Sequence, residues 1–137
     1  MELNKFEFYD LWLLLSIGTS SKGSNMKQIL SKGDYLNHAR FNLDELNNGM
    51  SKLIYNGFAE EVDNGRYKLT EKATEFYKEN RIEKEGSIDE MFRLSEIFQK
   101  IVAKKGCKYK EYFSKAEYEK RGKSKIIAFA KRVGLYD

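Results

Sequence analysis

Residues 43–57 constrain the fold more than any other stretch of the chain, because they specify both ends of a helix. Apolar residues recur there at three- and four-residue spacing, which predicts one buried face. Asn42 can cap the first turn, and Glu45 stands three positions later as the reciprocal partner of a capping box. Gly57 follows the last turn, where a residue with left-handed backbone commonly ends a helix. The sequence therefore predicts a capped helix over 43–56.

A β-hairpin is predicted directly after this helix. Two short, partly alternating runs at 58–62 and 66–69 flank the triplet Asp63-Asn64-Gly65. The Asn-Gly pair favours a tight hairpin turn, because both central residues of that turn need positive φ. Thr70 then provides the cap of another helix.

Helical spacing extends over most of the remaining chain, so the predicted fold class is mainly α with a small β-hairpin. The second helix is expected to be interrupted or bent near Gly33. Ser87 with Glu90, and Ser114 with Glu117, indicate two further capping boxes. The other predicted helices cover, approximately, residues 6–17, 26–36, 70–85, 87–105 and 115–133.

Composition indicates a soluble globular protein. The chain has 137 residues, 41% of them hydrophobic and 34% charged, which is enough for one ordinary domain with a real core. We expect a first unit over 6–85 and a C-terminal helical extension over 86–137. Residues 107–113 fit either an extended piece or a helical turn. No apolar run approaches the ~20 residues of a membrane span, and the single Cys107 favours a reducing, cytoplasmic location.

The net charge of +4 hides an asymmetry between the two parts of the chain. Residues 100–137 contain twelve Lys and Arg residues but only four Asp and Glu residues. Such a segment can attract phosphate by releasing counterions, although lysine-rich helices are also simply solvated surfaces. Both interpretations remain open from the sequence.

The hairpin region resembles that of winged-helix bacterial regulators. The residues that carry the resemblance are Leu53-x3-Gly57-Phe58 and Asn64-Gly65-x-Tyr67-x-Leu69-Thr70. This pattern is similar to the multiple-antibiotic-resistance and phenolic-acid regulators, and residues 33–39 look like small uncharacterised bacterial proteins of the same superfamily. The resemblance covers about residues 6–80. It implies a winged helix-turn-helix followed by C-terminal helices, in a DNA-binding protein that regulates transcription.

In a winged helix on DNA, the face of the third helix opposite its apolar stripe enters the major groove. Asn48 and Ser51 are therefore candidates for base contacts, and Lys52 for a phosphate contact. The complete set of candidates on this helix and the hairpin is Asn48, Ser51, Lys52, Tyr55, Arg66 and Lys68. Residues 43–68 have a net charge of −2, so we expect the basic C-terminal segment to assist through Lys120, Arg121, Lys123 and Lys125.

Self-association is expected through the helix that begins at Ser87. Its apolar residues cover more of the helix surface than docking on one neighbour requires, and a two-fold dimer commonly covers such a surface. The candidate dimer contacts are Ile88, Met91, Phe92, Ile97, Phe98, Ile101 and Val102. The competing interpretation is that residues 115–133 fold back and cover this helix within one chain.

Catalysis and metal binding have the least support in the sequence. His38 is the only histidine and has no cluster of ligand residues around it, so a structural role at the turn before the third helix is expected. Phosphate-binding glycine motifs and nucleophile motifs do not occur. We therefore expect no enzyme, no metal and no cofactor. The partner is expected to be double-stranded DNA, with a protein-binding module that does not bind DNA as the alternative.

Overall fold

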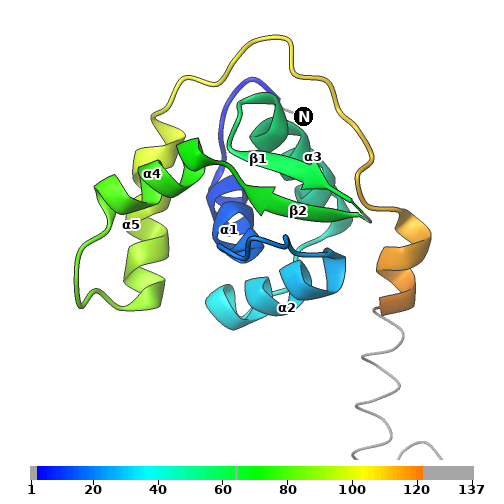
Figure 1. The fold of residues 1–137 in the computed structure, drawn as a ribbon, viewed down its shortest axis with the longest axis horizontal. Helices are drawn as coiled ribbons and strands as arrows, with labels where there is room; N and C mark the ends of the chain where they lie inside the picture. The colour runs from blue at the N-terminus through cyan, green and yellow to red at the C-terminus, as the bar shows by residue number, and fades with distance from the viewer. Residues whose placement is uncertain (1–2, 64, 122–137) are drawn as a thin grey trace, which may run out of the picture.

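The computed structural model describes residues 3–63 and 65–121, and within them the protein is mainly helical with one small β-hairpin (Figure 1). This confirms the predicted fold class. The elements are α1 (Phe8–Ile17), α2 (Met26–Asn37), α3 (Leu43–Tyr55), β1 (Ala59–Val62), β2 (Arg66–Leu69), α4 (Glu71–Asn80) and α5 (Ser87–Gln99). A further helix begins at residue 115 and continues to the end of the described residues.

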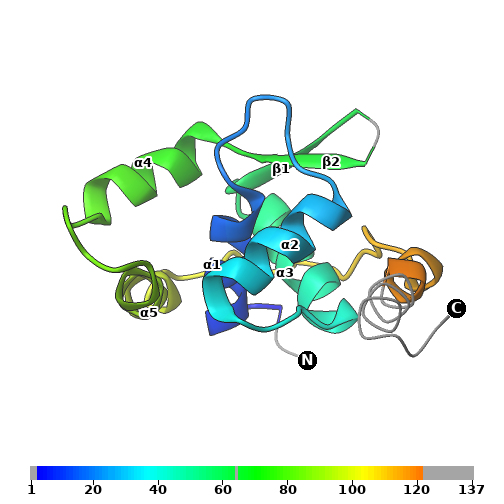
Figure 2. The same ribbon diagram turned by 90° about the horizontal axis from the view of Figure 1, so that it is seen from below.

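Helix α1 lies at the centre of the molecule and contacts α2, α3 and α5 (Figures 1 and 2). It is apolar on nearly all sides, and Leu11, Leu13 and Leu14 are completely or almost completely buried. Such a helix stays folded by packing rather than by propensity, because burial of each large apolar side chain contributes about 1.5–3 kcal/mol. The remaining elements are arranged around it.

The capped helix and the hairpin form as the sequence predicts. The Asn42 side chain accepts a hydrogen bond from the backbone of Glu45, and the Glu45 carboxylate accepts one from the backbone of Asn42. Strands β1 and β2 are antiparallel, with Ala59 opposite Leu69. The loop before α2 adds a bridge that the sequence did not indicate, because Ser24 pairs with Tyr67 on the free edge of β2.

Three predicted helix boundaries are wrong. Helix α2 runs without interruption through Gly33, which is required there because an added Cβ would lie 2.4 Å from the Phe41 ring. Helix α4 ends at Asn80, five residues earlier than expected. Helix α5 is capped by Gly86 without a side-chain hydrogen bond, so Ser87 does not form the expected capping box, and it ends at Gln99 rather than near Gly106.

After α5 the chain crosses the molecule without regular secondary structure. We call residues 100–113 the strap. It leads from α5 at one end of the molecule to the helix that starts at residue 115 at the opposite end (Figures 1 and 2). That helix is fixed to the α2–α3 turn, because Arg40 donates a hydrogen bond to the backbone oxygen of Tyr118 at 2.9 Å and the Tyr118 hydroxyl donates to the Phe41 backbone.

Candidate nucleic-acid interface

Helix α3, the helix expected to enter the DNA groove, is covered by the rest of the protein. All eight residues from 46 to 53 are buried. The expectation that Asn48, Ser51 and Lys52 form an outward face is therefore wrong, since their exposed fractions are 2%, 3% and 0%. In this structure α3 cannot present those side chains to a base edge. Tyr55 lies one turn further on and is 43% exposed.

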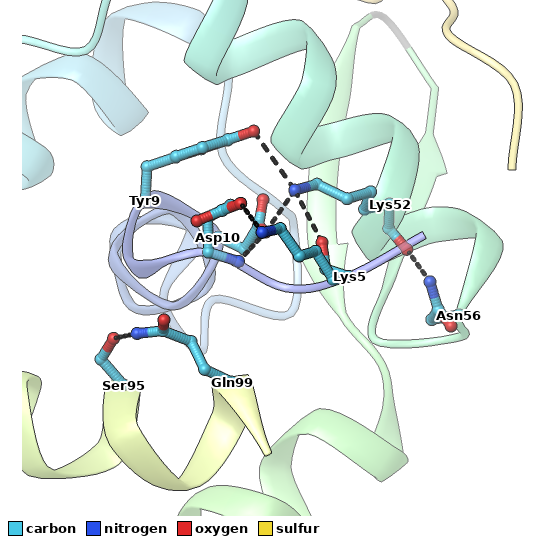
Figure 3. A network of polar contacts seen from close by, with 8 residues as sticks. Lys5, Tyr9, Asp10, Lys52, Asn56, Ser95 and Gln99 are labelled. Atoms are coloured by element: carbon cyan, nitrogen blue, oxygen red, sulfur yellow. Dashed lines mark hydrogen bonds and ion pairs between the residues drawn. The ribbon is translucent and has the colours of Figure 1, made fainter. Parts of the chain in front are cut away.

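One side of α3 is closed by a buried ion pair with α1. The Lys52 ammonium lies 2.6 Å from the Asp10 carboxylate, and both side chains are inaccessible to solvent. Lys52 also donates hydrogen bonds to the Lys5 backbone oxygen and the Tyr9 hydroxyl, each at 3.2 Å (Figure 3). Burial of the pair costs desolvation energy, which these close contacts offset only in part. Lys52 is thus a structural residue and has no free charge to offer a phosphate.

Burial also changes the acidity of the residues in this network. Burial raises the pKa of Asp10 from 3.8 to about 6, although the adjacent Lys52 and a backbone hydrogen bond pull it down. The pKa of Tyr9 is also raised, first by burial and then by the negative charge of Asp10. Lys52 therefore stabilises the Asp10 carboxylate only in part, and this network makes stability depend on pH.

The opposite side of α3 is covered by the strap, which α3 binds through polar side chains. Asn47 donates a hydrogen bond to the Phe113 backbone oxygen at 3.0 Å and accepts one from the Phe113 backbone nitrogen at 2.8 Å. Ser51 does the same for Lys110, at 3.2 and 2.9 Å. Both residues bind backbone atoms, so the contacts do not depend on the side chains of the strap.

Two residues at the end of α3 extend this contact. The Tyr55 hydroxyl donates to the Lys105 backbone oxygen at 2.8 Å, and the Asn56 side chain accepts from the Lys104 backbone nitrogen at 2.7 Å. Asn47, Ser51 and Tyr55 are spaced by four residues, which places them on one stripe of the helix. Two of the residues expected to contact DNA, Ser51 and Tyr55, instead hold the chain's own backbone.

The strap covers this face of α3 and presents its own basic surface to solvent. It contains one carboxylate, Glu111, and five lysines, all exposed: Lys100, Lys104, Lys105, Lys108 and Lys110. Among the described residues none of these lysines forms an ion pair with an acidic side chain. Closely spaced, unpaired cations on an anchored segment are suited to contact a polyanion.

The remaining predicted DNA-contact residues lie at the hairpin and near the end of the described chain. Arg66 and Lys68 are half-buried on β2, and Lys68 forms an ion pair with Glu60 at 3.2 Å. Lys120 is exposed on the last helix, where Arg121 pairs with Glu117 at 3.0 Å. Lys123 and Lys125 lie outside the described residues. The structure does not bring the hairpin and α3 candidates together on one open surface.

The predicted dimer residues divide between the core and the surface. Met91 and Phe98 are fully buried within the chain, and the Phe98 ring centroid lies 4.4 Å from that of Phe6. Their assignment to an exposed face is wrong, because α5 turns this side toward the core. Ile97 and Ile101 are half-buried. The exposed members of the predicted set are Ile88 at 45%, Phe92 at 52% and Val102 at 92%.

Other kinds of site have little support. No group of three or more potential metal ligands occurs among the described residues. None of the helices within those residues is long and apolar enough to cross a membrane. His38 ends α2 with left-handed backbone, and its backbone N–H donates a hydrogen bond to the Asp34 backbone oxygen. Burial raises the pKa of the Cys107 thiol, which lowers its reactivity.

Sequence reasoning missed Asn47 and Asn56, which anchor the strap, and did not single out the strap lysines. A local signal for the latter is present in residues 104–112, where lysines alternate with tyrosines. Comparisons with protein-family models, curated proteins and solved structures found no match to this chain. The geometry of α3 and the strap therefore supplies the basis for a functional proposal.

Proposed function

We propose that this protein binds double-stranded DNA through the lysines of the strap, with the winged helix as the scaffold that holds them. The observation that carries the proposal is a set of five exposed lysines, on a segment anchored to α3, that have no acidic partner among residues 3–63 and 65–121. Phosphate contacts supply most of the non-specific affinity of a protein for DNA. A role in transcription regulation follows from this binding as part of the same proposal.

The proposed contact is to phosphate rather than to bases. Base recognition in the major groove requires an exposed helix or ribbon with side chains directed at base edges. Residues 46–53 are buried, so α3 does not supply these side chains. Lysine is a compact charge on a flexible chain, which suits contact with phosphates of any sequence. We therefore expect weak sequence preference and strong dependence on salt.

A titration of duplex DNA at several salt concentrations tests the proposal. Replacement of Lys104, Lys105, Lys108 and Lys110 by Gln should weaken binding and flatten the salt dependence, since each lost phosphate contact removes about 0.9 from the slope of log affinity against log salt. The matched control replaces four exposed lysines elsewhere by Gln: Lys27, Lys32, Lys78 and Lys84. Equal affinity and slope in the two variants would contradict the proposal.

Lys52→Ala is not a useful reference for lost DNA contacts, because it leaves the buried Asp10 carboxylate without its partner. The basic residues at 120, 121, 123 and 125 remain candidates for further phosphate contacts. Their joint replacement should weaken binding in addition to the strap variant.

The second candidate function is a protein-binding module that does not bind DNA. The observation that favours it is the burial of α3 together with exposed apolar residues, including Ile82 at 55% and Phe92 at 52%. Large exposed apolar side chains are available for a protein contact. A lack of duplex binding by the full chain at low salt would favour this function over the first.

A further inference from the structure

The strap presents an exposed aromatic ring between two of its lysines. Tyr109 is 49% exposed, and Lys108 and Lys110 on either side of it are exposed as well. An exposed tyrosine that lies between two exposed lysines differs from the other strap aromatics. Tyr112 is half-buried and Phe113 is buried, and both rings pack against Tyr67 of the hairpin.

The strap is anchored to α3 on both sides of the segment that carries Tyr109. Ser51 holds Lys110 and Tyr55 holds Lys105, and these two α3 residues are one turn apart, about 5.4–6 Å along the helix. Five extended residue steps would cover about 17 Å. The backbone turns at Lys105–Gly106, where Gly106 has φ +92°. This turn takes up the excess length between the two anchors, and Gly106 stays close to α3, since an added Cβ there would lie 2.9 Å from the Tyr55 hydroxyl. Figure 1 shows the whole strap as an arch between α5 and the helix that starts at residue 115.

We propose that this arch binds single-stranded nucleic acid, with Tyr109 stacked on an unpaired base and Lys108 and Lys110 in contact with the adjoining phosphates. The inference rests on the proposed DNA-binding function and adds single-stranded nucleic acid as a second form that the strap binds. Stacking on an aromatic side chain is sequence-tolerant, because every base has a flat π face. In a duplex these faces are covered by neighbouring base pairs, so an exposed ring gains its stacking energy only from an unpaired base.

The immediate surroundings of the ring fit this assignment. Lys108 and Lys110 are the chain neighbours of Tyr109, and all three residues are exposed. The Lys110 ammonium lies 4.8 Å from the centroid of the Tyr112 ring, which keeps this cation close to the strap. The single carboxylate of the strap, Glu111, is exposed and forms no ion pair within the described residues.

Fluorescence anisotropy with the full-length chain tests the inference. The probes are a labelled oligothymidylate and a labelled duplex of the same length, each titrated at low and at physiological salt. Tyr109→Ala should weaken binding of the single strand by about 5- to 100-fold, the range typical of one base–aromatic stack. Tyr109→Phe should retain the single-strand affinity within about twofold, because the ring remains. Duplex affinity should change by less than about twofold in both variants.

The matched control is Tyr35→Ala, since Tyr35 is 73% exposed on α2 and lies outside the strap. It should leave both affinities unchanged. Unchanged single-strand affinity in Tyr109→Ala, or an equal loss for single strand and duplex, would overturn the stacking inference while DNA binding stands. A wild-type chain that binds neither probe at low salt would overturn the proposed function itself. Because Tyr109 is exposed, unchanged thermal unfolding of Tyr109→Ala verifies that any loss is not a folding defect.

Discussion

Lys52 shows how one residue can be misinterpreted from its position in a sequence. It lies on the polar side of an amphipathic helix, where a lysine is ordinarily a solvated group. In the structure its ammonium is buried against the Asp10 carboxylate, 42 positions earlier in the chain. Local spacing carries no information about that partner. The sequence shows that α3 carries a lysine on its polar side, but it could not predict that the charge of Lys52 is buried in the core.

The Asp10–Lys52 pair predicts an unusual dependence of stability on pH. The pKa of Asp10 is raised to about 6 in the folded protein against an ordinary value of 3.8. Between these values the folded state binds more protons than the unfolded state. The contribution of Asp10 to the free energy of unfolding is therefore fully present below about pH 4. The contribution is lost as the pH rises to about 6, by up to about 3 kcal/mol. Urea unfolding at a series of pH values measures it.

Asp10→Asn is the control for this pH dependence. Its amide does not titrate, so the difference in unfolding free energy between wild type and variant should itself change between pH 4 and pH 6. A difference that is constant over this range would contradict the raised pKa. Lys52→Met should cost roughly 3–5 kcal/mol at neutral pH, because it leaves a buried carboxylate without its partner.

Elements defined by neighbouring residues could be predicted from the sequence, whereas contacts between distant segments could not. The α3 cap depends on Asn42 and Glu45, three positions apart, and the hairpin on its own turn residues. The strap reaches α3 across more than 45 residues of sequence. Asn47 and Ser51 are polar, so their pattern indicates a solvated face. Only the fold shows that another part of the chain covers that face.

Removal of one anchor should loosen the strap. Asn47 is fully buried and satisfies both backbone groups of Phe113. Asn47→Ala leaves these groups without partners and should cost about 1–3 kcal/mol. Amide hydrogen exchange is expected to become faster at Phe113 and Lys110 before it changes in α1.

Asn37→Ala serves as the matched control, because Asn37 is half-exposed at the end of α2 and lies outside the strap contact. Exchange at Phe113 should be the same in this variant as in wild type. Unaltered exchange at Phe113 in Asn47→Ala would show that the strap does not depend on this anchor.

At the scale of the whole molecule, α5 remains a candidate for self-association. Its buried side completes the aromatic core, where the Phe98 ring lies within 5.4 Å of the rings of Phe6, Phe58 and Phe76. Its outer side leaves Phe92 half-exposed, stacked on Phe8 at 5.3 Å. The apolar residues of α5 extend over both of these sides. The sequence alone could not tell which of them are buried and which are exposed. Among the described residues Ile88 and Phe92 remain exposed on α5, and we expect a second copy of the chain to cover them.

Sedimentation equilibrium at micromolar concentration tests the predicted homodimer. A mass of about twice the 16.1 kDa of the chain is expected. Phe92→Glu should shift the species toward monomer without loss of helical signal, because this ring is 52% exposed. Phe98→Glu cannot serve for this purpose, since a buried charge there would unfold the chain. A mass near that of one chain at every loading would rule out the dimer.

The way in which α3 holds the strap has a consequence for protein engineering. The strap is held by hydrogen bonds from its backbone atoms to Asn47, Ser51 and Asn56. The outward side chains of residues 104–110 can therefore be exchanged without loss of this attachment. Proline cannot be placed at Lys104, Lys110 or Phe113, because it lacks the backbone N–H that forms these hydrogen bonds. The molecule thus offers a built-in display segment, on which acidic, aromatic or metal-binding sequences can be grafted while the underlying scaffold stays the same.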